Sequence, residues 1–214
     1  MKIMEKIAVA VALSIGSCAA QASTIYTNEA SFLAAAGNAL SFESFETVRS
    51  STSTQYNFAD VSFACTGTQF CPSFFGTSGV LAHDGAQSVF FASPDTATFT
   101  FTQAISAFGI WIGGAGDVAS LTLTAALGNG DTAPVLTNYS TPNTTTWNYF
   151  GIVADTAFTS ITFTPTNIGD GIYFDALRYQ AAAVNDVPEP ASALLFGIAG
   201  AGLLALRRKR GARR

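Results

Sequence analysis

Few residues of this chain could serve as the general base of a catalytic site. His83 is the only histidine among the 214 residues, so any Ser-His-Asp arrangement would have to include it. It lies in Leu81–Gly85 (LAHDG), where the Asp and the Gly are typical of a turn between strands. The sequence contains neither a G-x-S-x-G nucleophile elbow nor an H-E-x-x-H metal-binding motif. We therefore predict no catalytic residues and a protein that is not an enzyme.

Carboxylates keep one enzymatic alternative open. Residues 23–187 contain twelve Asp and Glu residues. Two carboxylates that face each other across a cleft can act as acid and base in glycoside hydrolysis, and only the tertiary structure sets their separation. An exported polysaccharide-acting hydrolase that uses paired carboxylates is therefore the alternative to a non-enzymatic function.

Aromatic side chains could bind a sugar, because a flat ring stacks on the apolar face of a sugar while polar groups fix its orientation. Trp147 and Tyr149 are two residues apart in a predicted strand, so both lie on the same side of it. They are the candidate ligand-stacking residues, with core packing as the alternative. Trp111 alternates with Ile110 and Ile112 and is predicted to be a core residue.

The cysteine pattern predicts a disulfide. After Cys18, only Cys65 and Cys71 are present, and five residues separate them. An even pair of cysteines in an oxidising compartment is typical of a disulfide that closes a small loop. A zinc site is the alternative, although two thiols without nearby histidines make an incomplete zinc shell.

Hydrophobic periodicity predicts the elements that position these side chains. Asn28–Gly37 has an Asn cap, an acid in the first turn and a terminal Gly, which together predict a helix. The rest alternates with a period of two, as in Thr98–Thr102 (TFTFT). The predicted strands are 40–46, 58–65, 88–92, 96–102, 105–112, 118–125, 146–153, 158–164 and 172–179. These short strands predict an all-β fold, an antiparallel β-sandwich or jelly roll with one short N-terminal helix.

A resemblance to jelly-roll carbohydrate-binding modules suggests a metal site. Those modules often hold a structural Ca²⁺ between an acid of an early strand and an acid of the last strand. By this resemblance, Glu43 or Glu46 and Asp175 would be the ligands. Pairing of these acids with Arg49 or Arg178 is the alternative. No EF-hand pattern is present.

The basic residues at the two ends of the chain offset much of the negative charge of the part between them. The whole chain has a formal net charge of −4, whereas residues 23–187 have two Arg, no Lys and twelve acids, a balance of −10. Binding to nucleic acid requires clustered cations that neutralise phosphates. The composition therefore excludes nucleic acid as a partner and favours a protein that stays soluble outside the cell.

The first 22 residues are typical of a secretory signal peptide. Two lysines precede an apolar run at residues 7–15, and small residues then lead to an Ala-x-Ala exit. We predict export by the Sec machinery and cleavage between Ala22 and Ser23. A lipoprotein-like box that ends at Cys18 is the alternative processing site.

The last 27 residues combine three features in a fixed order. The motif Pro188-Glu189-Pro190 comes first, an apolar segment follows at residues 191–206, and a cluster of cations ends the chain. As a helix, the apolar segment would be about 24 Å long, and snorkelling basic side chains would let it span a bilayer. The predicted stop-transfer residues are Arg207, Arg208, Lys209 and Arg210.

This order of features resembles the PEP-CTERM sorting signal of exported proteins from Gram-negative bacteria. The resemblance implies recognition by an exosortase at the inner membrane, cleavage near the Pro-Glu-Pro motif, and release to the cell surface or extracellular matrix. It predicts a signal peptide (1–22), a β-sandwich domain (23–180), a linker (181–187) and a sorting signal with a transmembrane helix (188–214). The expected function is binding or structural support in an exopolysaccharide or biofilm matrix, with polysaccharide as a partner.

Overall fold

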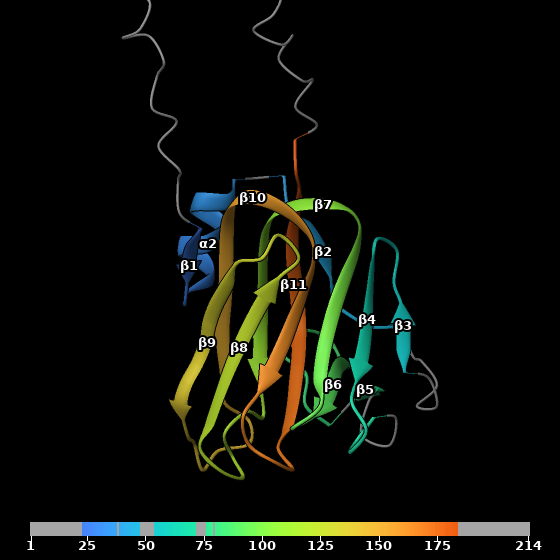
Figure 1. Ribbon diagram of the computed structural model, residues 1–214, viewed down its shortest axis with the longest axis vertical. Coiled ribbons are helices and arrows are strands. Elements are labelled where there is room, and N and C mark those ends of the chain that lie inside the picture. The colour runs from blue at the N-terminus through green and yellow to red at the C-terminus, as the bar shows by residue number, and fades with distance from the viewer. Residues whose placement is uncertain (1–22, 38, 48–53, 72–75, 79, 184–214) are drawn as a thin grey trace, which may run out of the picture. The chain divides into compact units, whose positions relative to one another are not determined.

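The described part of the chain folds into eleven strands and one short helix (Figure 1). This computed structural model describes residues 23–37, 39–47, 54–71, 76–78 and 80–183. The elements are β1 (Thr24–Tyr26), α2 (Glu29–Ala36), β2 (Ser41–Glu43), β3 (Gln55–Asn57), β4 (Val61–Thr66), β5 (Gly76–Ser78), β6 (Ser88–Ala92), β7 (Thr96–Gly113), β8 (Leu121–Leu127), β9 (Thr132–Tyr139), β10 (Trp147–Pro165) and β11 (Gly171–Ala181). Every strand pairing among them is antiparallel. The predicted all-β class with one short helix is confirmed.

Two long strands join the sheet into two layers. The first half of β7 pairs with β4 and with the second half of β10, whereas the second half of β7 pairs with β11 and with the first half of β10. Figure 1 shows β7 and β10 arching over one end of the molecule as they pass between the layers. β1, β2, β5, β6 and β11 complete one layer, and β3, β4, β8 and β9 complete the other.

The sequence predicted four strands where the structure has two. β7 runs without a break through the predicted strands 96–102 and 105–112, and β10 runs through 146–153 and 158–164. The register shifts on both sides of Phe158. Such a bulge bends a strand and increases its twist without ending its pairing, so the interruption of the alternation marks a bend and not a loop.

Four strands were not predicted, and each lacks a clear hydrophobic period. β1, β3 and β5 have three residues each, which is too short to show alternation. β9 is an edge strand with a proline, Pro134, and several polar residues. Proline cannot donate a ladder hydrogen bond and is therefore confined to strand edges. Pro134 thus fits an edge strand, although it makes β9 harder to recognise as a strand from the sequence.

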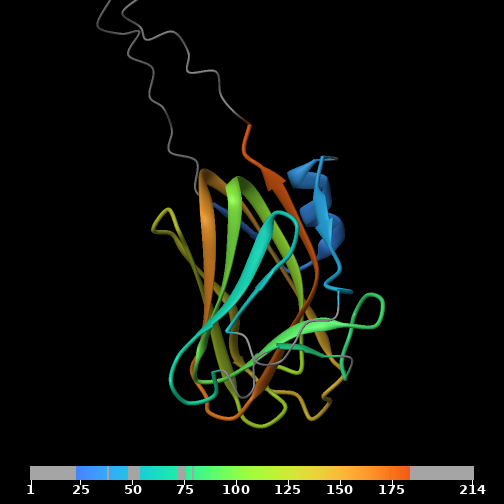
Figure 2. The same ribbon diagram turned by 90° about the vertical axis from the view of Figure 1, so that its right-hand side faces the viewer.

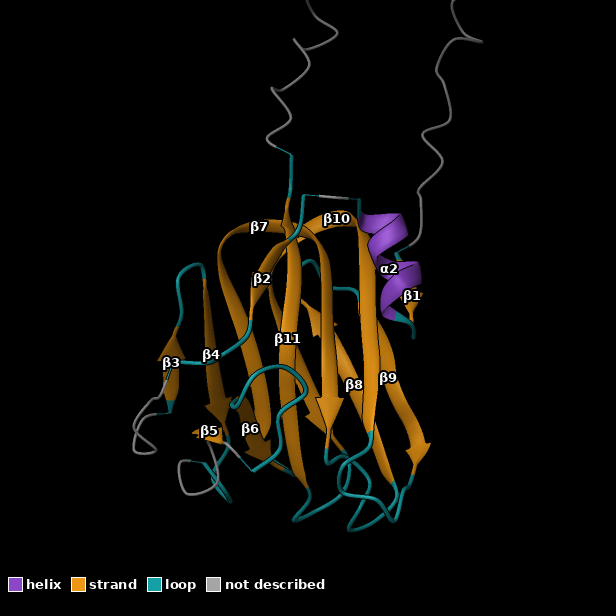
Figure 3. Ribbon diagram, turned by 180° about the vertical axis from the view of Figure 1, so that it is seen from behind, coloured by secondary structure: helices purple, strands orange, loops and turns teal. Residues whose placement is uncertain are grey.

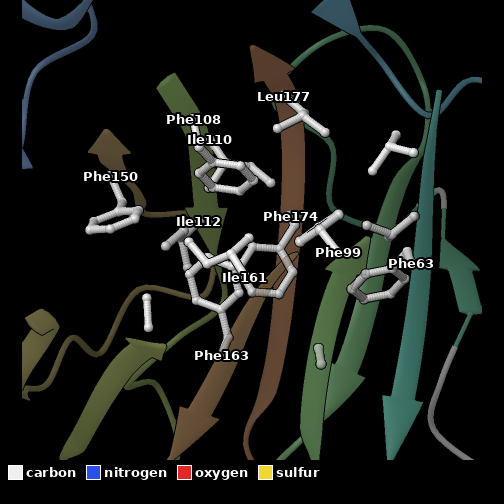
Figure 4. Close-up of a cluster of buried hydrophobic side chains, with 14 of the residues drawn as sticks. Phe63, Phe99, Phe108, Ile110, Ile112, Phe150, Ile161, Phe163, Phe174 and Leu177 are labelled. Carbon is white, nitrogen blue, oxygen red and sulfur yellow. The ribbon is translucent and has the colours of Figure 1, made fainter. Parts of the chain in front are cut away.

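The inner faces of the two layers enclose an aromatic core (Figure 4). Phe99 of β7 and Phe163 of β10 belong to one layer, Phe174 of β11 belongs to the other, and all three are fully buried. The ring centroids of Phe163 and Phe174 are 4.7 Å apart, and those of Phe99 and Phe174 are 5.4 Å apart. Because burial of each such side chain contributes about 1.5–3 kcal/mol, these contacts stabilise the pairing of the layers.

The predicted helix is confirmed, and it covers part of one outer face of the sheet (Figure 2). Asn28 caps its N-terminus by accepting a hydrogen bond from the Ser31 backbone N–H at 3.2 Å. The helix buries Phe32 against β7 and β10, where Gly109 and Gly151 lie. A Cβ at Gly151 would approach the Phe32 ring to 2.8 Å, so the absence of a side chain there allows the helix to pack closely.

The predicted disulfide between Cys65 and Cys71 is present, and the two Cα atoms are 6.0 Å apart. The carboxylate of Asp95 lies beside it and accepts hydrogen bonds from the backbone N–H groups of Phe70 and Cys71, each at 2.6 Å. These amide bonds outweigh the effect of burial and hold the pKa of Asp95 below its usual value. The loop is therefore fixed by a covalent link and by a charged acceptor.

The predictions for the two ends of the chain lie outside the described residues. These are the signal peptide, the sorting motif, the apolar segment and the stop-transfer cations. Within the described ranges, no helix has the length and apolarity needed to span a bilayer.

We predict that Gly151→Ala lowers the free energy of unfolding by about 1–3 kcal/mol, because the new methyl group would overlap the buried Phe32 ring. Urea denaturation followed by tryptophan fluorescence measures this loss. Gly171→Ala is the matched control, since its Cβ would meet Tyr173 at an ordinary 3.6 Å. Equal stability of the two variants would show that the helix does not need a glycine at position 151.

Candidate functional site

Aromatic side chains form a row across the outer face of the layer that carries the helix. Trp147 of β10 pairs with Gly113 of β7, Gly113 pairs with Tyr173 of β11, and Tyr173 pairs with Phe90 of β6. The rings of Phe90 and Tyr173 are stacked with centroids 5.6 Å apart. We call Trp147, Tyr173 and Phe90 the aromatic row. It crosses three gaps between strands, about 14 Å in all.

The Trp147 ring lies flat on the backbone of Gly113. Three atoms of the ring would each be 2.9 Å from a Cβ built at Gly113, so no side chain larger than hydrogen fits below the ring. The side chain is only half-buried. One face of the indole therefore packs on the sheet, and part of the side chain is exposed to solvent.

Trp111 occupies the next position along β7 on the same outer face. The prediction that Trp111 is a core residue is wrong, because its neighbours Ile110 and Ile112 fill the core and alternation turns Trp111 outward. Its indole N–H donates to Oε2 of Glu29 at 3.3 Å. The other carboxylate oxygen of Glu29 accepts a hydrogen bond from Nε of Arg178 at 2.7 Å.

Tyr149 lies behind Trp111 and is shielded by the helix. It is 6% exposed, and its ring contacts Phe32 and Trp111 with centroids 5.8 Å and 5.3 Å away. Burial raises the pKa of its hydroxyl well above the usual value, and the nearby Glu29 adds to the effect. Of the two predicted stacking residues, Trp147 is therefore the accessible one and Tyr149 supports the sheet surface.

The loop at residues 80–87 folds back over this face of the sheet, in front of β11 (Figure 3). The predicted turn is present, with a positive φ of 61° at Gly85. The His83 ring stacks on Trp111, with centroids 4.1 Å apart and planes 14° apart, and meets the edge of Trp147 at 5.4 Å. Burial lowers the pKa of His83, so a neutral imidazole lies beside the aromatic row at pH 7.

Two predicted calcium ligands instead hold this loop through its backbone. Asp175, which is fully buried, accepts hydrogen bonds from the backbone N–H groups of His83 and Asp84 at 2.7 and 2.8 Å. Glu46 accepts hydrogen bonds from the backbone N–H groups of Ala86 and Gln87 at 2.9 and 3.1 Å.

The third predicted ligand, Glu43, accepts a hydrogen bond from the Phe45 backbone N–H at 2.8 Å. Within the described ranges, the one group of three Cys, His or acidic side chains close enough to share an ion consists of Cys65, Cys71 and Asp95. Its two sulfurs are joined in the disulfide. Calcium binding at Glu43, Glu46 and Asp175 thus remains a prediction.

A pair of carboxylates lies at another place on the surface. The Ser23 hydroxyl is 2.9 Å from Oδ2 of Asp131 and 3.2 Å from Oδ1 of Asp155. The two carboxylates therefore lie close enough to act together. They line a pocket of about 250 Å³ with Ser23, Ile25, Thr132, Ala133 and Ile152. Among the described residues that line this pocket none is aromatic, in contrast to the aromatic row.

The comparison with known families identifies the C-terminal segment. Residues 186–210 match the family described as the PEP-CTERM protein-sorting motif. The chain carries a PEP-CTERM sorting signal. This match confirms the resemblance found in the sequence and indicates an exported protein that is sorted at the membrane as an exosortase substrate. The PEP-CTERM match covers only the end of the chain, and no curated protein matches the sequence.

Solved structures show only a distant likeness to this chain. The C-terminal family 22 carbohydrate-binding module of Clostridium thermocellum Xyn10B has 16% identity and a TM-score of 0.37, over 56% of this chain and 87% of that chain. An adhesin domain of Lys-gingipain from Porphyromonas gingivalis W83 has 12% identity and a TM-score of 0.44, over 68% and 100%. The catalytic unit of a family 87 α-1,3-glucanase from Streptomyces thermodiastaticus has 16% identity and a TM-score of 0.38, over 72% and 28%. No functional assignment rests on these matches.

We predict that Asp175 makes the stability depend on pH. Burial raises the pKa of this carboxyl to about 6, although three backbone N–H bonds oppose the rise. The folded protein then binds a proton more tightly than the unfolded chain, so the free energy of unfolding falls as the pH rises from about 4 to about 6. Asp175→Asn should lack this decrease of about 3 kcal/mol.

Urea denaturation of the protein and of Asp175→Asn between pH 4 and pH 8 measures the difference. Asp84→Asn removes a nearby charge that adds to the rise in the pKa of Asp175, so this variant should keep the decrease in a smaller form. Parallel pH profiles for the protein and Asp175→Asn would contradict the assignment.

Proposed function

We propose that this PEP-CTERM protein is a non-enzymatic polysaccharide-binding protein of the cell surface or extracellular matrix. The observation that carries the proposal is the aromatic row, in which the Trp147 indole lies flat on Gly113 at the outer face of the sheet. A ring held in this way can stack on the apolar face of a sugar without losing rotamer freedom on binding.

The groups around the row suit a carbohydrate ligand. The neutral His83 ring meets the edge of Trp147, and the Glu29–Arg178 ion pair lies beside Trp111. Sugar binding uses such a combination of flat apolar surface and a few polar groups that fix orientation. The two facing layers support a β-sandwich of the jelly-roll kind, whose outer face would be the binding surface.

Export supports the same proposal. The sorting signal at residues 186–210 indicates delivery to the cell surface, where bacterial polysaccharides are present. The acidic charge of the body favours solubility there. We infer a role within an exopolysaccharide or biofilm matrix, after passage through the Sec machinery and a transient stay in the inner membrane.

The hydrolase alternative would depend on Asp131 and Asp155. Both carboxylates contact the Ser23 hydroxyl, and glycosidases likewise use two carboxylates that flank one site. However, the Ser23 hydroxyl lies between them, and the pocket has no ring on which a sugar could stack. Binding at the aromatic row is therefore the better-supported function.

We predict that Trp147→Ala weakens glycan binding about 5- to 150-fold, since loss of the stacked ring removes about 1–3 kcal/mol of binding energy. A glycan array identifies the ligand, and titration calorimetry then compares the processed protein with the variant. Tyr173→Ala should also weaken binding. Thr164→Ala is the control, because Thr164 is exposed on the second half of β10, where the strand pairs with β8 in the other layer.

The same titrations in calcium and in chelator test the proposed calcium site at Glu43, Glu46 and Asp175. Chelator should weaken binding or lower the melting temperature if calcium holds the loop. Unchanged affinity in Trp147→Ala would contradict binding at the row, and release of reducing sugar from the bound glycan would favour the hydrolase.

We predict that replacement of Pro188, Glu189 and Pro190 by alanine blocks processing at the C-terminus. The processed protein should lack Arg214, whereas the variant should keep it and stay in the membrane fraction. Intact-mass spectrometry of both fractions measures the outcome. An Arg214-containing protein released from wild-type cells would show that the signal is not removed.

A further inference from the structure

Ser23 is the first residue after the predicted signal-peptide cleavage site, and it lies between two carboxylates. Ser23 precedes β1, which pairs with β10 at Thr24 and Val153. Its hydroxyl is 2.9 Å from Asp131, in the turn before β9, and 3.2 Å from Asp155 of β10. Segments more than a hundred residues apart thus meet at the N-terminal residue of the mature protein.

This pair of carboxylates lacks a cation. A hydroxyl has one proton and can donate to only one of the two carboxylates at a time. The Asn129 side-chain amide also donates to Asp131, at 3.2 Å, but it is neutral. In the described part of the chain, Arg178 is the one Lys or Arg, and it is paired with Glu29. Two carboxylates therefore line the same pocket, and no Lys or Arg among the described residues is available to pair with them.

We propose that the pocket is a binding site for the α-ammonium group that signal-peptide cleavage creates on Ser23. Hydrolysis breaks the peptide bond between Ala22 and Ser23, adds the oxygen of water to the Ala22 carbonyl, and leaves a protonated amine on Ser23. The nitrogen and the hydroxyl oxygen of one serine are three bonds apart, so this amine is a near neighbour of the carboxylates that the hydroxyl contacts. An ammonium group has three N–H donors and can bind both at once.

The ion pair makes the attachment of β1 depend on processing. Before cleavage, the Ser23 nitrogen is a neutral amide and the carboxylates repel each other. After cleavage, the cation pairs with both and holds the start of β1 against β10 and the turn before β9. The charged groups that face the ammonium from the described elements are Asp131 and Asp155 alone. This inference concerns maturation and does not depend on the proposed glycan binding.

The proposal predicts a raised pKa for the α-amine. An ordinary α-amine has a pKa of about 7.7–8.0, and two adjacent carboxylates favour its charged form. The stabilisation by this ion pair is fully present below the pKa that the α-amine has in the unfolded chain. It is lost as the pH rises through the higher pKa of the α-amine in the folded protein.

The test uses the exported, signal-processed protein, whose first residue is checked by mass spectrometry. Brief acetylation over a range of pH, with peptide mapping of the N-terminal peptide, measures the pKa of the α-amine. We expect a value about one unit above the ordinary one. Replacement of both Asp131 and Asp155 by Asn should restore the ordinary value. Ser23→Ala should keep the raised value, and Asp84→Asn should leave it unchanged.

A second measurement, of the melting temperature, separates the effect of the ion pair from an effect on local folding. Insertion of one Ala before Ser23 moves the amine by about 3.5 Å, and this protein should melt about 2–4 °C lower at pH 6.5. The difference should vanish at pH 10.5, where the amine is neutral. An ordinary α-amine pKa, a raised pKa that survives the double replacement, or a mature chain that starts at another residue would each overturn the proposal.

Discussion

The continuous antiparallel pairing of β7 with β10 is the constraint on which the rest of the structure depends. The two strands stay paired on both sides of the bulge at Phe158, so a single pair of strands sets both layers and the space between them. The inner side chains of the layers then meet as one core, where Phe99 and Phe163 contact Phe174. The same register fixes the outer face, because alternation turns every second residue outward. The aromatic row is thus a product of the core geometry.

Several acids of the body accept hydrogen bonds from backbone amides. Asp95 holds the disulfide loop, while Asp175 and Glu46 hold the loop that carries His83. Backbone N–H donors are already ordered by the fold, so these charge-assisted bonds cost less side-chain entropy than an exposed ion pair. A domain with few Lys or Arg can therefore fix its loops and remain strongly acidic. Ser23 between Asp131 and Asp155 is different, since its hydroxyl alone cannot satisfy both carboxylates.

Sequence patterns predicted the local features and missed those that arise from pairing. The helix after Asn28 and the disulfide were predicted because each depends on residues close together in the chain. The alternation of apolar and polar residues predicted most strands. It split β7 and β10 into two strands each, because a bulge interrupts the alternation in the same way as a loop. Trp111 was assigned to the core because alternation gives the period of a strand but does not identify its inner side. Trp147 was found as an aromatic candidate, whereas Tyr173 and Phe90 gave no signal.

The sequence alone determined the all-β class, the exported character and the PEP-CTERM sorting signal at residues 186–210. These features depend on composition, on hydrophobic periodicity and on contiguous motifs. Each of these can be recognised in a single stretch of the chain. Only the tertiary structure decided that Trp147, Tyr173 and Phe90 form one row, and that Ser23 meets Asp131 and Asp155. The physical reason is that antiparallel pairing brings together residues that are far apart in sequence, and no local pattern records which strands will pair.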